Sequence, residues 1–205
     1  MKIVAVSQRI DFHRERGETR DALDQRLISF LLAAGCLPVP VPNNLSLDET
    51  TEESAQVRLN DWLTTLAIGA IVLSGGNDIG QYEVRDRTER WLLDQARDKQ
   101  LPVLGICRGM QMLAHWAGTA LHPVSGHILT RHRLSGIIDT EVNSYHAFSL
   151  VDCPNGFEVL ARSNDGEIEA IRHLALPWEG WMWHPERETD FAAADLLRAR
   201  SLLHV

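Results

Sequence analysis

One cysteine stands where the surrounding pattern favours nucleophilic chemistry. Cys107 follows the apolar run 103–106, lies between Gly105 and Gly109, and precedes a helical pattern at 110–117. A strand, a tight turn and a helix in this order form a nucleophile elbow, which exposes the reactive side chain at the carboxyl edge of a sheet. The N-terminus of the helix favours the thiolate over the thiol. We therefore predict that Cys107 is a nucleophile and that both glycines allow backbone and substrate to approach closely.

A histidine and a glutamate towards the end of the chain can complete such a site. A reactive thiol needs an imidazole within hydrogen-bond reach, and the imidazole needs a partner on its other ring nitrogen. His184 and Glu186 lie two positions apart, with Pro185 between them. In an extended segment, such residues project on the same face, and the proline stiffens the geometry. Glu186 therefore suits the task of orienting the imidazole.

Two motifs carry a resemblance to a known family. Gly-Ile-Cys-Arg-Gly-Met-Gln at 105–111 resembles the nucleophile motif of class I glutamine amidotransferases, especially their γ-glutamyl hydrolase branch. The similarity includes Gly-Gly-Asn-Asp at 75–78 with Arg-Asp at 85–86, and it returns at Trp-His-Pro-Glu in 183–186. The resemblance implies a γ-glutamyl amide as the small-molecule substrate and no cofactor. It also implies a triad of nucleophile, general base and orienting carboxylate, formed by Cys107, His184 and Glu186.

Further residues are expected around the substrate. Acyl transfer needs hydrogen-bond donors for the oxyanion, and we predict the backbone N–H groups of Arg108 and of Gly76, in the glycine turn after a strand. The resemblance implies that Gln111 binds the glutamyl head. It implies the same role for a second segment, formed by Asn143, Ser144, Tyr145 and His146. The chain departs from the family pattern at 147–148 and 119–123, so the resemblance says least about the leaving-group side.

Histidines and arginines gather in two stretches. His122, His127 and His132 are spaced by five residues, which matches no standard ligand pattern, so we predict no metal there. Instead, Arg131 and Arg133 predict an anion site for a phosphorylated leaving group, with a solvated basic loop as the open alternative. A second basic cluster gives the same expectation; it comprises Arg9, Arg14, Arg16 and Arg20. Residues 17–26 and 42–44 resemble a subgroup of small bacterial enzymes that hydrolyse γ-glutamyl-CDP-amidate during capsule phosphoramidate synthesis.

Alternating strand and helix patterns must position these residues. Apolar β-branched runs predict strands at 3–6, 39–41, 70–74 and 102–106, and residues 8–18 are expected to be an exposed loop. Helical spacing predicts helices at 21–34, 55–67, 85–99, 110–117 and 190–203. Shorter strands are expected at 141–142, 158–161, 167–171 and 181–183. This order predicts an α/β fold, a single-domain three-layer sandwich over 1–205 with a mostly parallel, flavodoxin-like central sheet.

Composition limits the classes of function. With 205 residues and a formal net charge of −8, a broad nucleic-acid surface is not expected. No stretch reaches the roughly 18 apolar residues of a membrane span. The three cysteines form no CxxC pair, so Cys36 and Cys153 are expected to be ordinary apolar side chains in a reducing compartment. We predict a cytoplasmic protein without nucleic-acid or membrane partners, and a homodimer is left open.

Three kinds of function remain open at this point. The first is a stand-alone γ-glutamyl hydrolase, and the second is a glutaminase subunit that delivers ammonia to a partner synthase. The third is a non-catalytic binding module of the same fold. The given sequence holds no fused synthase domain, which favours the first, and the intact set of Cys107, His184 and Glu186 argues against the third.

Overall fold

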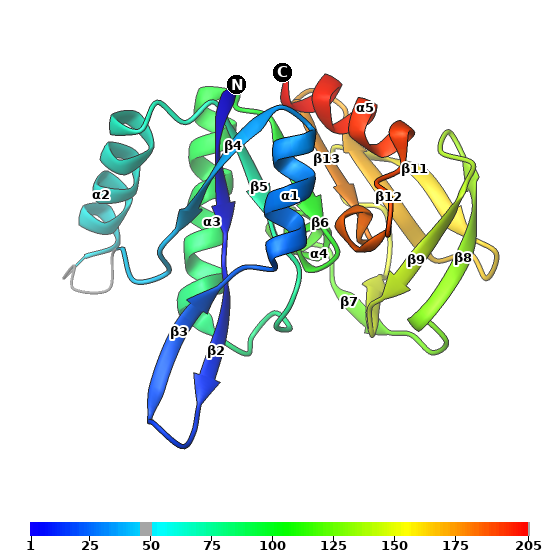
Figure 1. The fold of residues 1–205 in the computed structure, drawn as a ribbon, viewed down its shortest axis with the longest axis horizontal. Coiled ribbons are helices and arrows are strands. Elements are labelled where there is room, and N and C mark those ends of the chain that lie inside the picture. Colours follow the sequence, from blue (N-terminus) through cyan, green and yellow to red (C-terminus); the bar gives the residue numbers. More distant parts are fainter. Residues whose placement is uncertain (46–50, 205) are drawn as a thin grey trace.

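A nine-stranded sheet forms the centre of the computed structural model, which describes residues 1–45 and 51–204. Its strand order is β4-β1-β5-β6-β13-β12-β11-β8-β9 (Figure 1). The first five of these strands run parallel to their neighbours; they are β4 (Cys36–Val41), β1 (Lys2–Ser7), β5 (Ala70–Leu73), β6 (Val103–Ile106) and β13 (Trp178–Trp181). The other four pair antiparallel; they are β12 (Ile168–His173), β11 (Phe157–Ser163), β8 (Ile128–Gly136) and β9 (Glu141–Tyr145).

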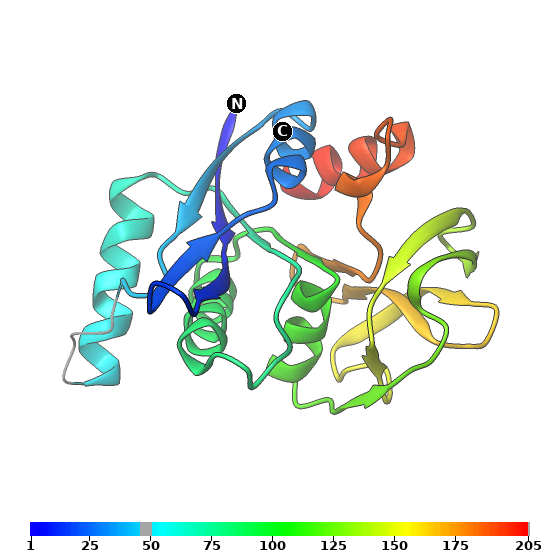
Figure 2. The same cartoon turned by 60° about the horizontal axis from the view of Figure 1, so that its bottom comes forward.

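Helices cover both faces of the parallel half. One face carries α1 (Gln25–Ala33) and α5 (Ala193–Leu203), which Figure 2 shows on the opposite side of the sheet from α3 and α4. The other face carries α2 (Glu52–Thr65), α3 (Glu83–Lys99) and α4 (Arg108–Trp116). The predicted α/β fold with a mostly parallel central sheet is therefore confirmed. The single domain expected over 1–205 stays a prediction.

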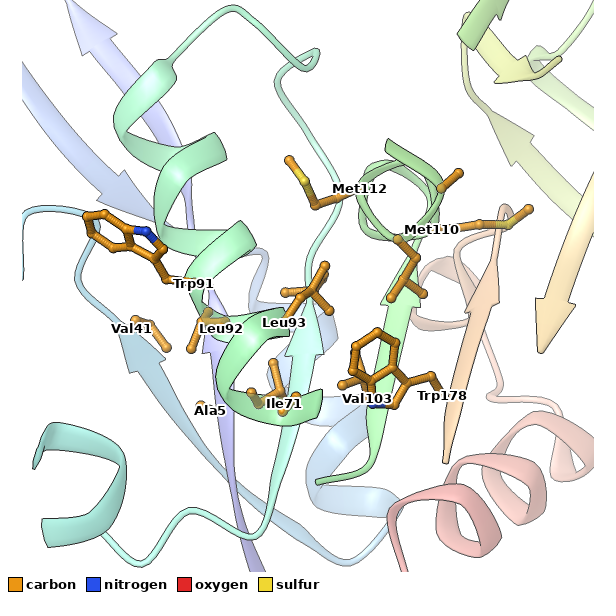
Figure 3. Packing of buried hydrophobic residues seen from close by; sticks show 14 of the residues in the cluster. Ala5, Val41, Ile71, Trp91, Leu92, Leu93, Val103, Met110, Met112 and Trp178 are labelled. Atoms are coloured by element: carbon orange, nitrogen blue, oxygen red, sulfur yellow. The ribbon is translucent and has the colours of Figure 1, made fainter. Parts of the chain in front are cut away.

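Two hydrophobic cores follow from the alternation of side chains along buried strands. In β1, Ala5 belongs to the core under α2, α3 and α4, whereas Val4 and Val6 belong to the core under α1 and α5. Strands buried on both faces show this near-continuous apolar pattern. Figure 3 shows the first core, where Leu92 and Leu93 of α3 pack towards the sheet. The three layers thereby hold β5 and β6 rigidly, with the glycine turn and Cys107 at their ends.

The segment after β1 differs from the prediction. Residues expected to be an exposed loop form an antiparallel hairpin of β2 (Arg9–His13) and β3 (Glu18–Ala22), which projects from the body in Figure 1. Helix α1 consequently starts later than predicted, at Gln25, and Asp24 caps it by accepting the N–H of Arg26. The hairpin was missed because β3 is polar and mostly exposed, and β2 carries only a short alternation of two apolar residues, the buried Ile10 and the exposed Phe12.

Two further short strands were also missed, namely β7 (Leu121–Pro123) and β10 (Phe148–Leu150), which pair with each other. The last predicted strand, 181–183, lies at 178–181 instead, and the chain then turns into a 3₁₀ helix, η1 (Pro185–Arg187). In the described part of the chain, no helix is both long enough and apolar enough to cross a membrane.

Candidate active site

The predicted nucleophile elbow is present between β6 and α4. Cys107 has φ 52° and ψ −107°, a conformation that a non-glycine residue adopts only under constraint from its surroundings. Its N–H donates to the carbonyl of Trp181 at 2.7 Å, and its carbonyl accepts the N–H of Gln111 at 3.1 Å. These bonds tie the turn to β13 on one side and to α4 on the other.

Both flanking glycines are required by backbone packing. A Cβ at Gly109 would lie 2.2 Å from the carbonyl oxygen of Leu73, and one at Gly105 would lie 2.6 Å from the backbone of Gly109. Real Cβ atoms do not come so close, so any side chain would push α4 away from β5 and β6. The close approach at these glycines is therefore between strand and helix.

The imidazole of His184 joins the elbow to a buried carboxylate. Its Nδ1 lies 2.5 Å from Oε1 of Glu186, and both side chains are almost fully buried. Burial alone would lower the pKa of His184, but hydrogen bonds and charges from Cys107 and Glu186 outweigh it and raise the pKa to about 9. The carboxylate thus fixes one ring nitrogen and leaves the other for the thiol.

The extended geometry predicted for residues 184–186 is wrong, although the expected contact between His184 and Glu186 is present. His184 precedes the 3₁₀ helix η1, with Pro185 at its first position. Proline suits the first position of a helix because its missing N–H is not needed there. A tight turn, rather than an extended strand, therefore brings Glu186 under the imidazole.

A neighbouring strand holds the backbone of the histidine. The side chain of Asn143, in β9, accepts the N–H of His184 at 2.9 Å and donates to its carbonyl at 2.8 Å. The ring of Tyr145 meets the imidazole edge-on, with centroids 5.6 Å apart. The guanidinium of Arg187 stacks over Tyr145, 4.4 Å from the ring centroid. Arg187 was not predicted, although it directly follows Glu186.

The glycine turn after β5 lies against the same imidazole. A Cβ at Gly75 would lie 2.7 Å from Cε1 of His184. The guanidinium of Arg85 donates to the carbonyls of Ser74, at 2.8 Å, and of Gly75, at 3.1 Å. In a trans peptide, C=O and the next N–H point in opposite directions, so the N–H of Gly76 points away from Arg85.

A buried ionic network lies beneath this turn and the elbow. Arg85 pairs with Glu89 at 3.0 Å, and Arg108 pairs with both Asp86 and Glu89. Burial lowers the pKa of both guanidinium groups to about 9, which leaves them charged at neutral pH. The network was missed, because charges on a helix usually indicate a solvated face; the Arg-Asp pair at 85–86 was its only signal.

Comparison with known proteins agrees with this geometry. The family profile "Glutamine amidotransferase class-I" matches residues 19–201. The chain belongs to the class I glutamine amidotransferase family. It is 33% identical to the gamma-glutamyl-CDP-amidate hydrolase of Campylobacter jejuni, over 64% of this chain and 68% of that protein. It is 29% identical to a glutamine-hydrolyzing GMP synthase subunit of Methanococcus aeolicus, over 77% and 79% of the two chains.

Solved structures agree on the fold. A GMP synthase subunit from Thermoplasma acidophilum superposes with a TM-score of 0.71, at 18% identity, over 100% of this chain and 93% of that one. A glutamine amidotransferase of Thermotoga maritima superposes with a TM-score of 0.63, at 17% identity, over 97% and 80%. The class I glutamine amidotransferase fold predicted from the two motifs is therefore confirmed.

The residues that the family resemblance assigned to the glutamyl head are engaged in other contacts. Gln111 donates from Nε2 to the carbonyl of Phe148 at 2.9 Å. The hydroxyl of Ser144 donates to the carbonyl of His127 at 2.7 Å, and His146 is buried beside His127. Together with Asn143, these side chains hold the framework of the site. Tyr145 is the member of the predicted segment that faces His184.

Carboxylates pair with both arginines of the anion site predicted at 131–133. Arg131 pairs with Glu141 at 2.7 Å and Glu188 at 3.0 Å, and Arg133 pairs with Asp139. The anion site at Arg131 and Arg133 stays a prediction, and an anion there would compete with these carboxylates for both guanidinium groups. Alternation along β8 turns both arginines to solvent and the intervening His132 inward.

Arg9 lies beside the glycine turn of the candidate site. Its guanidinium is next to Gly76, and it lines a cavity that also includes Gly75 and His184. Asn77 holds the base of the hairpin there, since its side chain accepts the N–H of Ile10 at 2.7 Å and donates to its carbonyl at 3.0 Å. Arg9 also pairs with Asp11 at 2.9 Å, so its charge is shared.

Replacing Gly75 by alanine is expected to lower kcat/KM roughly 100-fold, because the added methyl displaces the imidazole by part of an ångström. The clash is with Cε1 of His184 at 2.7 Å. The matched control is Gly69→Ala, whose methyl meets only the flexible side chain of Lys2 at 3.0 Å. The measurement is steady-state glutamate release; equal rates for the two variants would contradict the placement of His184 against this turn.

Proposed function

We propose that this protein hydrolyses a γ-glutamyl amide bond through a glutamyl thioester on Cys107, with His184 and Glu186 as the other members of a catalytic triad. The observation that carries the proposal is the buried imidazole, which is bonded to a carboxylate and whose pKa is raised by its interactions with both Glu186 and the cysteine of the elbow. Membership of the class I glutamine amidotransferase family supports amide hydrolysis.

The proposed reaction has two halves. The thiolate of Cys107 attacks the γ-carbonyl carbon, and the N–H groups of Gly76 and Arg108 stabilise the resulting oxyanion. The imidazolium of His184 gives its proton to the departing nitrogen, which leaves as an amine or amidate with that proton. His184 then takes a proton from water, whose oxygen attacks the thioester carbon; the bond to sulfur breaks and glutamate leaves.

For the glutamyl head, we propose a place beside the imidazole. Strand β9 is the last strand of the sheet, so its outer backbone edge is free of strand partners among the described residues. Tyr145 and Arg187 lie at this edge, next to His184. We propose that backbone groups of 143–145, the guanidinium of Arg187 and Oε1 of Gln111 bind the α-amino and α-carboxylate groups.

For the leaving group, we propose the nucleotide diphosphate of γ-glutamyl-CDP-amidate, with cytidine diphosphoramidate as the second product. The Campylobacter relative carries this substrate in its name. Arg9 lies beside Gly76, and we propose that its guanidinium pairs there with a phosphate of the leaving group. The second candidate is a glutaminase that supplies ammonia to a partner synthase, which the similarity to a glutamine-hydrolyzing GMP synthase subunit favours.

A panel of γ-glutamyl amides separates these two candidates. Purified protein is incubated without any partner with γ-glutamyl-CDP-amidate, L-glutamine and γ-glutamyl amides of simple amines, and glutamate release is measured. The hydrolase proposal expects the nucleotide-linked substrate to have the highest kcat/KM. The second candidate would be favoured if glutamine were the one substrate of the panel that is hydrolysed, or if glutamine were hydrolysed only when a synthase is present. We further propose that the protein acts in the cytoplasm, which its free cysteines support. A homodimer is compatible with the proposed mechanism, because each chain carries all three residues of the proposed triad.

The pH profile tests the proposed proton donor. The pKa of His184 is raised to about 9, so the imidazole is protonated at neutral pH and loses its proton as pH rises through 9. Acylation is therefore expected to fall above about pH 9. The stability gained from this imidazolium is complete below about pH 6.5, decreases as pH rises from there, and is lost once pH has passed through about 9. Glu186→Gln removes one of the two groups that raise the pKa, so the alkaline limb should move roughly 1–3 units lower. An unmoved limb would exclude His184 as its source.

A further inference from the structure

A buried cluster of three histidines and a glutamate lies in the antiparallel half of the sheet. His127, His132, His146 and Glu169 each offer one ligand atom, and these four atoms lie within 4.8 Å of one another. His127 directly precedes β8 and His132 lies within it, whereas His146 directly follows β9 and Glu169 lies in β12. The side chains of His127, His146 and Glu169 are at most 1% exposed. We propose that this cluster binds one divalent transition-metal ion, zinc in the first place.

The hydrogen bonds made by the remote nitrogens of His127 and His146 decide which ring nitrogens are protonated and which offer a lone pair to the centre of the cluster. Nε2 of His127 lies 2.7 Å from a carboxylate oxygen of Asp165, and Nδ1 of His146 lies 3.0 Å from the carbonyl of Phe148. Both partners are acceptors, so these nitrogens carry the protons. Metal-binding histidines almost always donate from the remote nitrogen to a carboxylate or backbone carbonyl in this way.

The atoms that face the centre are consequently all acceptors. Nδ1 of His127 and Nε2 of His146 are 3.1 Å apart, each with a lone pair, and Oε1 of Glu169 lies 3.2 Å from the second. Lone pairs so close repel one another unless a proton or a metal ion lies between them. Within the described part of the chain, Nε2 of His132 and Oε2 of Glu169 are buried and have no hydrogen-bond partner.

The distances fit a small tetrahedral ion. With metal–ligand bonds of about 2.0–2.1 Å, the donors of a tetrahedral zinc site are about 3.3–3.4 Å apart. The three observed separations among His127, His146 and Glu169 are 3.1, 3.2 and 3.4 Å. Nε2 of His132 is 3.9 Å from Oε1 of Glu169, so a small rotation of its ring completes the set. Three imidazoles and one carboxylate suit zinc, and four protein ligands make the site a structural one.

Position in the fold indicates what the ion would do. The carbonyl of His127 accepts a hydrogen bond from the hydroxyl of Ser144. The carbonyl of Phe148 accepts hydrogen bonds from both His146 and Nε2 of Gln111. The backbone of Glu169 accepts the N–H of Met182 at 2.8 Å, two residues before the imidazole of the active site. The ion would therefore hold three strands together directly beside the substrate-binding edge.

Zinc binding by the whole chain is the test. Protein freed of metal with a strong chelator is titrated with zinc in competition with a chromophoric chelator, and separately with cobalt(II), whose visible spectrum reports tetrahedral coordination. One equivalent is expected to bind with submicromolar affinity, and saturating zinc is expected to raise Tm by about 5–10 °C. Failure of the wild-type protein to bind one equivalent would overturn the proposal and would leave the amide-hydrolase proposal untouched.

Variants then locate the ion. Glu169→Gln and His132→Gln are each expected to weaken zinc binding at least about 100-fold, and Asp165→Asn by roughly 10–100-fold. The matched control is His122→Gln, because His122 pairs with Glu167 outside the cluster. It should bind zinc like the wild type. Equal weakening in all variants, or none in any, would overturn the site. If the Glu169→Gln variant does not fold, the Asp165→Asn variant decides whether the site is correct. Asp165 is more exposed and bonds to the remote nitrogen of His127.

Discussion

Replacing Cys107 by serine is expected to abolish glutamate release, with kcat lowered at least about 10⁴-fold. Removing the nucleophile of a triad costs about as much as removing the whole triad, because its members act as a unit. A serine hydroxyl lacks the thiolate that the elbow and the buried imidazole favour. The fold should persist, since the substitution exchanges one atom at a side chain of which 7% is exposed.

The measurement is single-turnover glutamate release, with circular dichroism to confirm folding. The matched control is Cys153→Ser, because Cys153 is free and partly buried but stands in no strained turn. That variant should retain full activity. Turnover by the Cys107→Ser variant would exclude thioester chemistry, and absence of turnover by the wild type on every γ-glutamyl amide would revive the non-catalytic binding module.

Replacing Glu89 by alanine is expected to lower the free energy of unfolding by about 3–5 kcal/mol, which corresponds to a fall of roughly 10 °C in Tm. Glu89 has no exposed surface and pairs with both Arg85 and Arg108. Its loss leaves two buried positive charges facing each other without their shared counter-ion. Activity per folded molecule should also fall, because Arg85 holds the carbonyls of the glycine turn.

Urea unfolding followed by fluorescence measures this change. The control is Asp139→Ala, which breaks the exposed ion pair with Arg133 and should cost less than about 1 kcal/mol. Should the alanine variant fail to fold, Glu89→Gln keeps the side-chain volume and allows the same comparison. A change below about 1 kcal/mol at Glu89 would mean that the buried network does not support the turn.

The parallel half of the fold could be predicted from the sequence because its strands are short, apolar and followed by amphipathic helices. The run 103–106, Cys107 and the following helix appear in the structure in that order, with the expected turn. The antiparallel half was harder, because its strands are half-exposed and their polar residues mask the alternation. The stretch 128–136 alternates Arg131 and Arg133 with His132, and composition alone suggested a basic loop there.

The candidate site shows the same division. Cys107, His184 and Glu186 could be predicted because their motifs are local. Asn143 and Gln111 were assigned to substrate by resemblance, and the bonds that their side chains make to the backbone of His184 and Phe148 were not predicted. The histidine cluster escaped prediction because its donors are distributed over three strands, and a spacing of five residues carries no signal. Such sites become visible only when the pairing of strands is known.

The parallel pairing of β6 with β13 also sets the timing of events during synthesis. These two strands are far apart in the chain, yet the thiol stands at the end of one and the imidazole shortly after the other. A ribosome delivers the N-terminal half first. The cysteine therefore emerges before the imidazole, and under the proposed mechanism the nascent polypeptide has no amide-hydrolysing activity until nearly all of the described chain has been made and the last parallel strand has docked.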